Sequence, residues 1–249
     1  MRSQANPANL CLVTAVDVEF KTATSLLSQQ FRLTESGFNI CQGFFGDRGV
    51  TILQCGMGAY GFAEWLNLHL KNNSYNALIV VGLAGALDSE LKAGDAVIYD
   101  LCRDGRGEEC HEVRCDERLA ESLRKTFQLA SLRSFHGTGI TVSRIITDAE
   151  DKLQLRETQQ AIAVDMESFE ALRVAAEFGL PAVAVRVISD EAIHDLPDFN
   201  YASEPDGKIN YQRLTVAMLR RPAASFRFLA NLKLVLAALR ESLQVVLRV

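Results

Sequence analysis

The chain has 249 residues, of which 48% are hydrophobic and 23% are charged, the balance of an ordinary globular protein rather than a disordered or fibrous one. Its formal net charge of −5 argues against nucleic acid as a partner. Its longest unbroken apolar runs fall short of the roughly 20 residues that a membrane-spanning helix needs. The six cysteines are scattered and predict reduced thiols rather than a disulfide framework. Because the first residues also lack the pattern of a signal peptide, we expect a cytoplasmic protein.

A strand over residues 9–14 and a helix over about 20–30 are expected at the start, with Asp17 and Glu19 between them. Two interpretations of these acids stay open at this point. They cap the helix and favour its positive end, or they carry chemistry at the end of the strand.

The next expected strand, residues 50–54, leads into a glycine pair, Gly56 and Gly58, before a helix over about 60–70. Such a turn lets backbone amides approach an anion or a sugar, but a tight strand-to-helix turn needs glycine equally. The pair is not the dinucleotide-binding fingerprint, because the third glycine and the downstream acid do not line up.

The middle of the chain continues the alternation of strand and helix. Strands are expected over 77–81, 95–99 and 136–143, helices over 116–128 and 148–157, and an exposed polar excursion over 101–114. The excursion holds Cys110 and His111 and is followed by Cys115. Three loosely spaced ligands without a fourth do not make a zinc site, so no metal is predicted.

Residues 161–192 give the strongest chemical signal, because they read as strand, helix and strand. The helix has apolar residues at helical spacing and ends at Gly179 and Pro181. Glu167 follows the first strand and Asp190 follows the second. Carboxylates at the carboxyl ends of strands lie where open α/β sheets bind ligands.

The C-terminal part, about residues 208–249, is predicted as an amphipathic helical extension interrupted at Pro222, after a loop over residues 194–207 that covers a site. Arginine and lysine residues are interleaved with its leucines. Two interpretations are open: a helix packed on the domain or on a partner subunit, or a basic amphipathic surface that meets a membrane or a lipid-like substrate.

Three segments resemble motifs of the nucleoside phosphorylase and nucleosidase superfamily, and they occur in the order of that family. They are VGLAGALDSELKAGDAVIYD (residues 81–100), AVDMES (163–168) and VRVISDEA (185–192). The resemblance covers roughly residues 9–195. Within the superfamily, residues 143–168 and 209–232 most closely resemble the hopanoid-associated phosphorylases, which release adenine from adenosylhopane.

The resemblance implies one domain over residues 1–249. The implied fold is a three-layer α/β/α sandwich around a mixed, partly barrel-like central sheet. It implies a homo-oligomer, a purine nucleoside as substrate and no metal or organic cofactor.

The resemblance also assigns catalytic roles. Asp190 matches the acid that protonates or hydrogen-bonds the purine N7, and an aspartate at this position implies a 6-aminopurine, hence adenine. Glu19 lies where the nucleosidases place the glutamate that activates water. Glu167 and Met166 match the ribose clamp, in which the carboxylate accepts hydrogen bonds from the sugar hydroxyls.

The remaining implied contacts are to the base and to phosphate or water. Arg186 is implied either to hold phosphate or to pair with an acid inside the site. The other implied residues are Gly56 and Gly58 for phosphate or water, Ala84 and Gly85 for the floor beneath the base, Ile145 and Ile146 for the wall where nucleosidases have phenylalanine, and Asp165 and Ser189 for the substrate. A serine of the nucleosidases is replaced by Leu83.

The expected activity is therefore cleavage of the N-glycosidic bond of a 5′-substituted, adenosylhopane-like adenosine. Adenine is released by hydrolysis, or by phosphorolysis with inorganic phosphate as cosubstrate. The alternatives are a methylthioadenosine/adenosylhomocysteine nucleosidase, a phosphorylase of ordinary purine nucleosides, or a non-catalytic nucleoside-binding module. The presence of both Asp190 and Glu167 argues against the last, because a binder needs the ribose clamp but not the acid.

Overall fold

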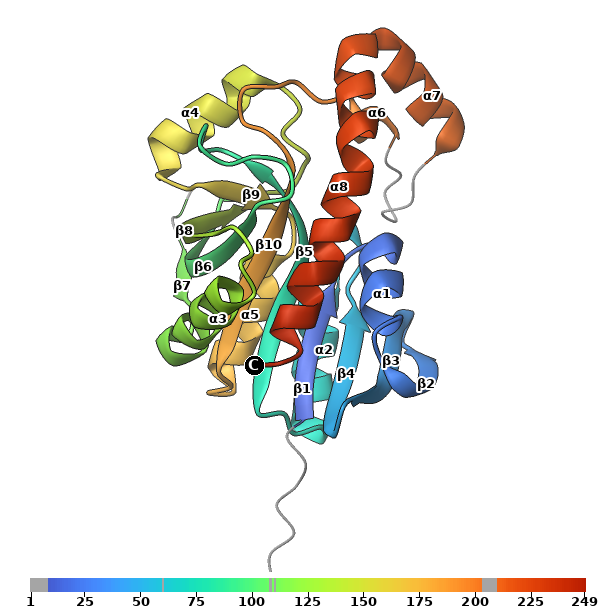
Figure 1. Cartoon of the computed structure of the whole chain (residues 1–249), viewed down its shortest axis with the longest axis vertical. Helices are drawn as coiled ribbons and strands as arrows, with labels where there is room; N and C mark the ends of the chain where they lie inside the picture. The colour runs from blue at the N-terminus through green and yellow to red at the C-terminus, as the bar shows by residue number, and fades with distance from the viewer. Residues whose placement is uncertain (1–8, 60, 108, 110, 203–209) are drawn as a thin grey trace, which may run out of the picture.

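The computed structural model describes residues 9–59, 61–107, 109, 111–202 and 210–249, and it contains one ten-stranded mixed sheet (Figure 1). The strands are β1 (Asn9–Thr14), β2 (Ser28–Glu35), β3 (Phe38–Phe45), β4 (Arg48–Gln54), β5 (Ala77–Ala86), β6 (Ala96–Asp104), β7 (Glu112–Arg114), β8 (Ser134–Thr141), β9 (Ala163–Asp165) and β10 (Ala182–Asp190). The helices that the structure describes are α1 (Asp17–Thr24), the 3₁₀ turn Met57–Ala59, α2 (Phe62–Asn72), α3 (Glu117–Leu129), α4 (Ala149–Gln159), α5 (Ser168–Glu177), α6 (Phe199–Ala202), α7 (Tyr211–Arg220) and α8 (Pro222–Val246).

Strand β5 organises the sheet because it pairs with β1, β9 and β10. The order β10–β6–β8–β9–β5, together with the β10–β5 pairing, closes half of the sheet into a barrel. β5 runs parallel to β1 and to β10, so these strands deliver their carboxyl ends to the same edge. The expected mixed, partly barrel-like sheet is confirmed.

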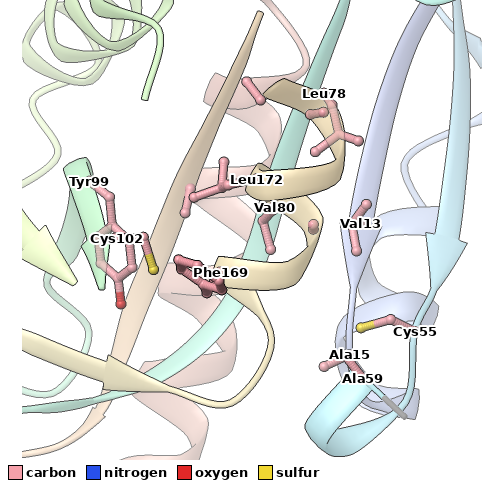
Figure 2. Close-up of a cluster of buried hydrophobic side chains, with 14 of the residues drawn as sticks. Val13, Ala15, Cys55, Ala59, Leu78, Val80, Tyr99, Cys102, Phe169 and Leu172 are labelled. Atoms are coloured by element: carbon pink, nitrogen blue, oxygen red, sulfur yellow. The ribbon is translucent and has the colours of Figure 1, made fainter. Parts of the chain in front are cut away.

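Alternate residues along the strands point to opposite faces of the sheet, and each face has its own hydrophobic core. Leu78 and Val80 of β5 face α2 and α5, whereas Ile79 and Val81 face α1, α3 and α8 (Figure 1). In Figure 2, Leu172 of α5 lies over the sheet with its side chain toward the first of these cores. Helices thus cover both faces, which confirms the three-layer α/β/α architecture.

Two local predictions are wrong. The first helix ends at Thr24, and residues 28–35 form the edge strand β2, whose side chains are almost all exposed. Such a strand is held by backbone pairing to β3, so it has no buried alternation that a sequence pattern reveals. The exposed excursion over 101–114 is also shorter than predicted, because β6 continues to Asp104 and residues 112–114 pair back onto it as β7.

The sequence predicts reduced cysteines and no metal site, and both predictions involve residues 110–115. Every cysteine within the described residues is free. Cys110 lies outside the described residues. In the ranges that the structure describes, no group of three or more His, Cys, Asp or Glu side chains is arranged to hold a metal ion.

The C-terminal extension forms α7 and α8, which meet at Pro222 as predicted. Over the described part of the chain, α8 is long and apolar enough to cross a membrane by length and composition alone. Arg227 and Lys233 interrupt the run without making the helix polar. The second half of α8 belongs to the core, since Leu239 and Leu243 are fully buried.

Candidate active site

A cavity of about 300 Å³ opens at the carboxyl ends of β1, β5, β9 and β10, within the size range of small-molecule sites. All the predicted site residues line it except Gly56, Gly58 and Arg186. Those that line it are Glu19, Ala84, Gly85, Ile145, Ile146, Asp165, Met166, Glu167, Ser189 and Asp190. Residues from five separate segments of the chain therefore meet in one place.

Arg186 of β10 lies beneath the cavity floor and is fully buried. Its Nε is 3.2 Å from Asp165 Oδ2 and donates to Ser168 Oγ at 3.0 Å, and its Nη2 donates to Glu167 Oε2 at 3.5 Å. Of the two roles left open by the sequence, the geometry matches the internal ion pair. Buried ions need such partners, because desolvation of an unpaired charge is costly.

Asp165 anchors the turn that leads into α5. Its Oδ1 accepts hydrogen bonds from Thr141 Oγ1 at 2.8 Å and from the N–H groups of Glu167 and Ser168 at 3.0 and 2.9 Å. Its Oδ2 accepts from the Tyr99 hydroxyl at 3.0 Å. Burial acts to raise the pKa of Asp165, but Arg186 and these hydrogen bonds outweigh it and the pKa is lowered. Although it borders the cavity, this carboxylate is occupied in holding the loop that carries Glu167.

Glu19 caps α1 and also lines the cavity. Its Oε2 accepts from the N–H groups of Ala15 and Val16 at 2.7 and 3.2 Å, which caps α1. Its Oε1 accepts from Leu83 N–H at 2.7 Å, and the side chain also lines the cavity. Burial raises the pKa of Glu19, against the opposing effect of Arg186.

The glycine at position 82 makes the approach of Glu19 to Arg186 possible. A Cβ there would lie 2.6 Å from Arg186 Nη1 and 2.7 Å from Glu19 Oε1. Both side chains fill the space where any other residue would place its first carbon. The cluster of charges and the glycine therefore require each other.

Glu167 is held by the glycine turn that the sequence assigned to phosphate or water. The Gly58 N–H donates to Glu167 Oε1 at 3.0 Å, and the Gly56 N–H donates to the Ala15 carbonyl at 3.1 Å. Both amides are thus engaged within the protein. Burial, together with the neighbouring Asp165 and Glu19, raises the pKa of Glu167 to about 7 despite Arg186.

Asp190 has a counter-ion of its own, Lys152 of α4, which sequence reasoning missed. The fully buried ammonium donates to Asp190 Oδ2 at 2.6 Å and to the carbonyls of Glu191 and His194 at 3.1 Å each. These three acceptors match its three N–H donors. Ser189 Oγ donates to Asp190 Oδ1 at 2.5 Å. The only sequence signal was a lysine in a helix of weak amphipathic pattern.

The remaining wall of the cavity is apolar and comes partly from the C-terminal extension. Ile145 and Ile146 are joined by Leu214 and Phe228 of α7 and α8. Phe199, also in the wall, packs edge to face on Phe228 with ring centroids 5.1 Å apart. The expected loop over the site therefore contributes an aromatic ring that the Ile145–Ile146 segment lacks.

Polar contacts fix this wall to the rest of the domain. Asn200 of α6 exchanges two hydrogen bonds with the backbone of Ile145, at 3.0 and 2.8 Å. Arg221, between α7 and α8, donates to Asp148 Oδ1 at 2.7 Å and to the Leu196 carbonyl at 3.0 Å. The extension is thus part of the cavity rather than an appendage.

Replacing Glu167 with glutamine should change the pH dependence of stability. The pKa of this carboxyl is about 7 in the folded chain against an ordinary value of 4.5, so the folded state binds the proton more tightly. As the pH rises from 4.5 to 7, wild type should lose up to about 3 kcal/mol relative to Glu167→Gln. Urea unfolding of both proteins at pH 5 and pH 8 measures this. Equal pH responses would contradict the raised pKa.

Replacing Lys152 with methionine should destabilise the fold by about 3–5 kcal/mol, because the Asp190 carboxylate stays buried without its cation. The double variant Lys152→Met/Asp190→Asn should recover part of the loss. Lys92→Met is the matched control: this half-exposed lysine pairs with Glu191 at 3.4 Å, and its loss should cost less than about 1 kcal/mol. Urea unfolding measures all three, and a Lys152 variant as stable as the control argues against the buried pair.

Comparison with known proteins agrees with this architecture. Residues 9–220 match the family model described as phosphorylase superfamily. A 5′-methylthioadenosine/S-adenosylhomocysteine nucleosidase of Haemophilus ducreyi is 28% identical over 73% of this chain and 84% of its own length. The enzyme of the same name from Staphylococcus aureus strain JH9 is 25% identical over 73% of this chain and 86% of its own.

Solved structures share the fold at low sequence identity. The nucleosidase of Neisseria meningitidis in complex with methylthio-immucillin-A gives a TM-score of 0.74 at 17% identity, over 96% of this chain and 97% of the other. Futalosine hydrolase of Helicobacter pylori gives 0.69 at 16%, over 90% and 96%. With most of its length matched by the family model and its carboxylates gathered at the expected strand ends, the chain belongs to the phosphorylase superfamily.

Proposed function

We propose that this protein cleaves the N-glycosidic bond of a 5′-substituted adenosine by hydrolysis and releases adenine. The observation that carries the proposal is the convergence of Asp190, Glu167 and Glu19 on one cavity of about 300 Å³. Curated relatives at 28% and 25% identity are nucleosidases of this kind.

In the proposed reaction, the C1′–N9 bond breaks and its electron pair passes to the purine. Asp190 transfers a proton to N7, and this proton lets the base leave as a neutral molecule. The Lys152 ammonium, 2.6 Å from Asp190, holds the side chain of this acid in place. Ser189, which donates to the other carboxylate oxygen, fixes the direction in which Asp190 faces the base.

The sugar and the water are assigned to the opposite end of the cavity. Glu167, held by the Gly58 N–H at 3.0 Å, accepts hydrogen bonds from the ribose hydroxyls when it is ionised. Glu19 accepts a proton from the water whose oxygen bonds to C1′. Its raised pKa suits a general base near neutral pH. The products are adenine and the 5-substituted ribose.

The engagement of the candidate anion donors supports water as the nucleophile. The Gly56 and Gly58 amides donate to protein acceptors, and Arg186 is fully buried. Phosphorolysis is the second candidate, because Arg144 also lines the cavity. Its guanidinium is 3.4 Å from Asp151 and would have to turn toward phosphate.

The 5′ substituent is assigned to the apolar wall. The names of the relatives favour methylthioadenosine or adenosylhomocysteine as the first candidate substrate. An adenosylhopane-like substrate is the second candidate, because Leu214 and Phe228 from the extension and Phe199 from α6 offer apolar contact to a larger group. We place the reaction in the cytoplasm and expect a homo-oligomer.

Asp190→Asn should lower adenine release by about 10²–10⁴-fold, because asparagine cannot supply the proton. Circular dichroism checks that the variant is folded, because the buried Lys152 ammonium loses its counter-ion. Asp195→Asn is the matched control: this aspartate accepts from the Ala149 N–H outside the cavity, and its amide keeps an acceptor. Full activity of Asp190→Asn would overturn the proposed acid.

The nucleophile and the 5′ group can be separated by one assay. Adenine release is measured from methylthioadenosine and from adenosine with a long 5′-alkyl chain, each with and without phosphate. We expect release without phosphate and production of a free ribose. If release requires phosphate, the reaction is phosphorolysis and not hydrolysis. If only the alkyl substrate is cleaved, an adenosylhopane-like compound becomes the better candidate substrate.

A further inference from the structure

The outward side of α7 and of the first half of α8, which we call the tail surface, is unusually apolar. Its large apolar side chains are exposed by 38–78%; they are Val216, Leu219, Phe226, Leu229 and Leu234. Only 22% of the most apolar window of α8 is buried. Most of this stretch therefore lies outside the core, and single exposed leucines do not account for it.

The same stretch is strongly basic. Residues 211–240 contain six arginines and lysines and no aspartate or glutamate, whereas the whole chain has a net charge of −5. Arg221 and Arg240 are engaged with Asp148 and Ser25. Arg220 and Lys233 are exposed beside the apolar side chains. Apolar residues bordered by cations are the composition of helices that lie on anionic lipid.

Placement decides how these helices meet a bilayer. Leu239 and Leu243 in the second half of α8 are fully buried in the core, so α8 cannot cross a membrane while the domain stays folded. The first half, with α7, projects beyond the sheet (Figure 1). The structure therefore allows contact with a membrane surface and not insertion across it.

The tail surface also lies next to the cavity. Leu214 and Phe228 of the same two helices line the cavity, while Leu219 and Phe226 are exposed by 75% and 78%. One pair of helices thus has the cavity on its inner side and an apolar, basic surface on its outer side.

We propose that the tail surface docks on an anionic lipid bilayer. An isologous contact with a second copy of this chain is disfavoured, because it would bring together two surfaces that each carry exposed cations such as Arg220 and Lys233, in a stretch without aspartate or glutamate. Together with the proposed function, docking would bring the cavity to substrates whose apolar 5′ group partitions into lipid. The docking itself does not depend on that function.

The test is co-sedimentation of the full chain with vesicles of phosphatidylcholine, alone or mixed with phosphatidylserine. Binding to the mixed vesicles only, reversed by high salt, is the expected result. Phe226→Asp should weaken it by about tenfold or more. Arg220→Gln and Lys233→Gln should each weaken it by about fivefold. Phe31→Asp is the matched control: this phenylalanine is 62% exposed on β2, and binding should not change.

Three results would overturn the proposal: no vesicle binding, equal binding to neutral vesicles, or a Phe226→Asp variant that binds like wild type. Light scattering tests whether a second copy of this chain occupies the tail surface instead. If wild type is a dimer and Phe226→Asp is a monomer, the tail surface is a dimer interface. Adenine release from soluble methylthioadenosine should be the same for Phe226→Asp and wild type. If wild type binds anionic vesicles but releases no adenine from any substrate, the proposed function fails and the docking stands.

Discussion

The cavity depends on one buried guanidinium, Arg186, placed in the middle of an otherwise apolar strand. Its charge compensates Asp165 and Glu167, which it contacts directly, and Glu19, which it approaches beside Gly82. Three carboxylates around one cation cannot all be ionised without excess negative charge in a desolvated site. Burial raises the pKa of both Glu19 and Glu167, and for Glu167 the neighbouring Asp165 and Glu19 add to that effect.

The acid on the other side of the cavity belongs to a separate charge system. Lys152 balances Asp190 one to one and satisfies its own donors on two backbone carbonyls. The protein thus keeps two groups of ionisable residues with different counter-ions around one cavity. Different environments for two carboxylates are what acid and base roles require.

Sequence reasoning located the carboxylates because they sit at strand ends, where hydrophobic period, Gly179 and Pro181 mark the boundaries. It did not find Lys152, whose contact with Asp190 joins residues 38 apart, because no local pattern encodes which buried acid a helical lysine meets. It left Arg186 between two roles, since charge alone does not reveal burial. β2 was not predicted, because the side chains of this edge strand are almost all exposed and give no alternating hydrophobic pattern.

The C-terminal extension contributes apolar side chains to the cavity. The carboxylates come from the sheet, from α1 and from the turn after β9, whereas Leu214 and Phe228 enter the same cavity from the extension and Phe199 enters it from α6. The second half of α8 is buried in the core. Arg221 ties the junction of α7 and α8 to Asp148, and Asn200 ties α6 to Ile145. The wall is therefore held in place by the same core that holds the catalytic groups. Under the proposed function, this apolar wall would select the 5′ group and the ionisable groups would carry the cleavage chemistry.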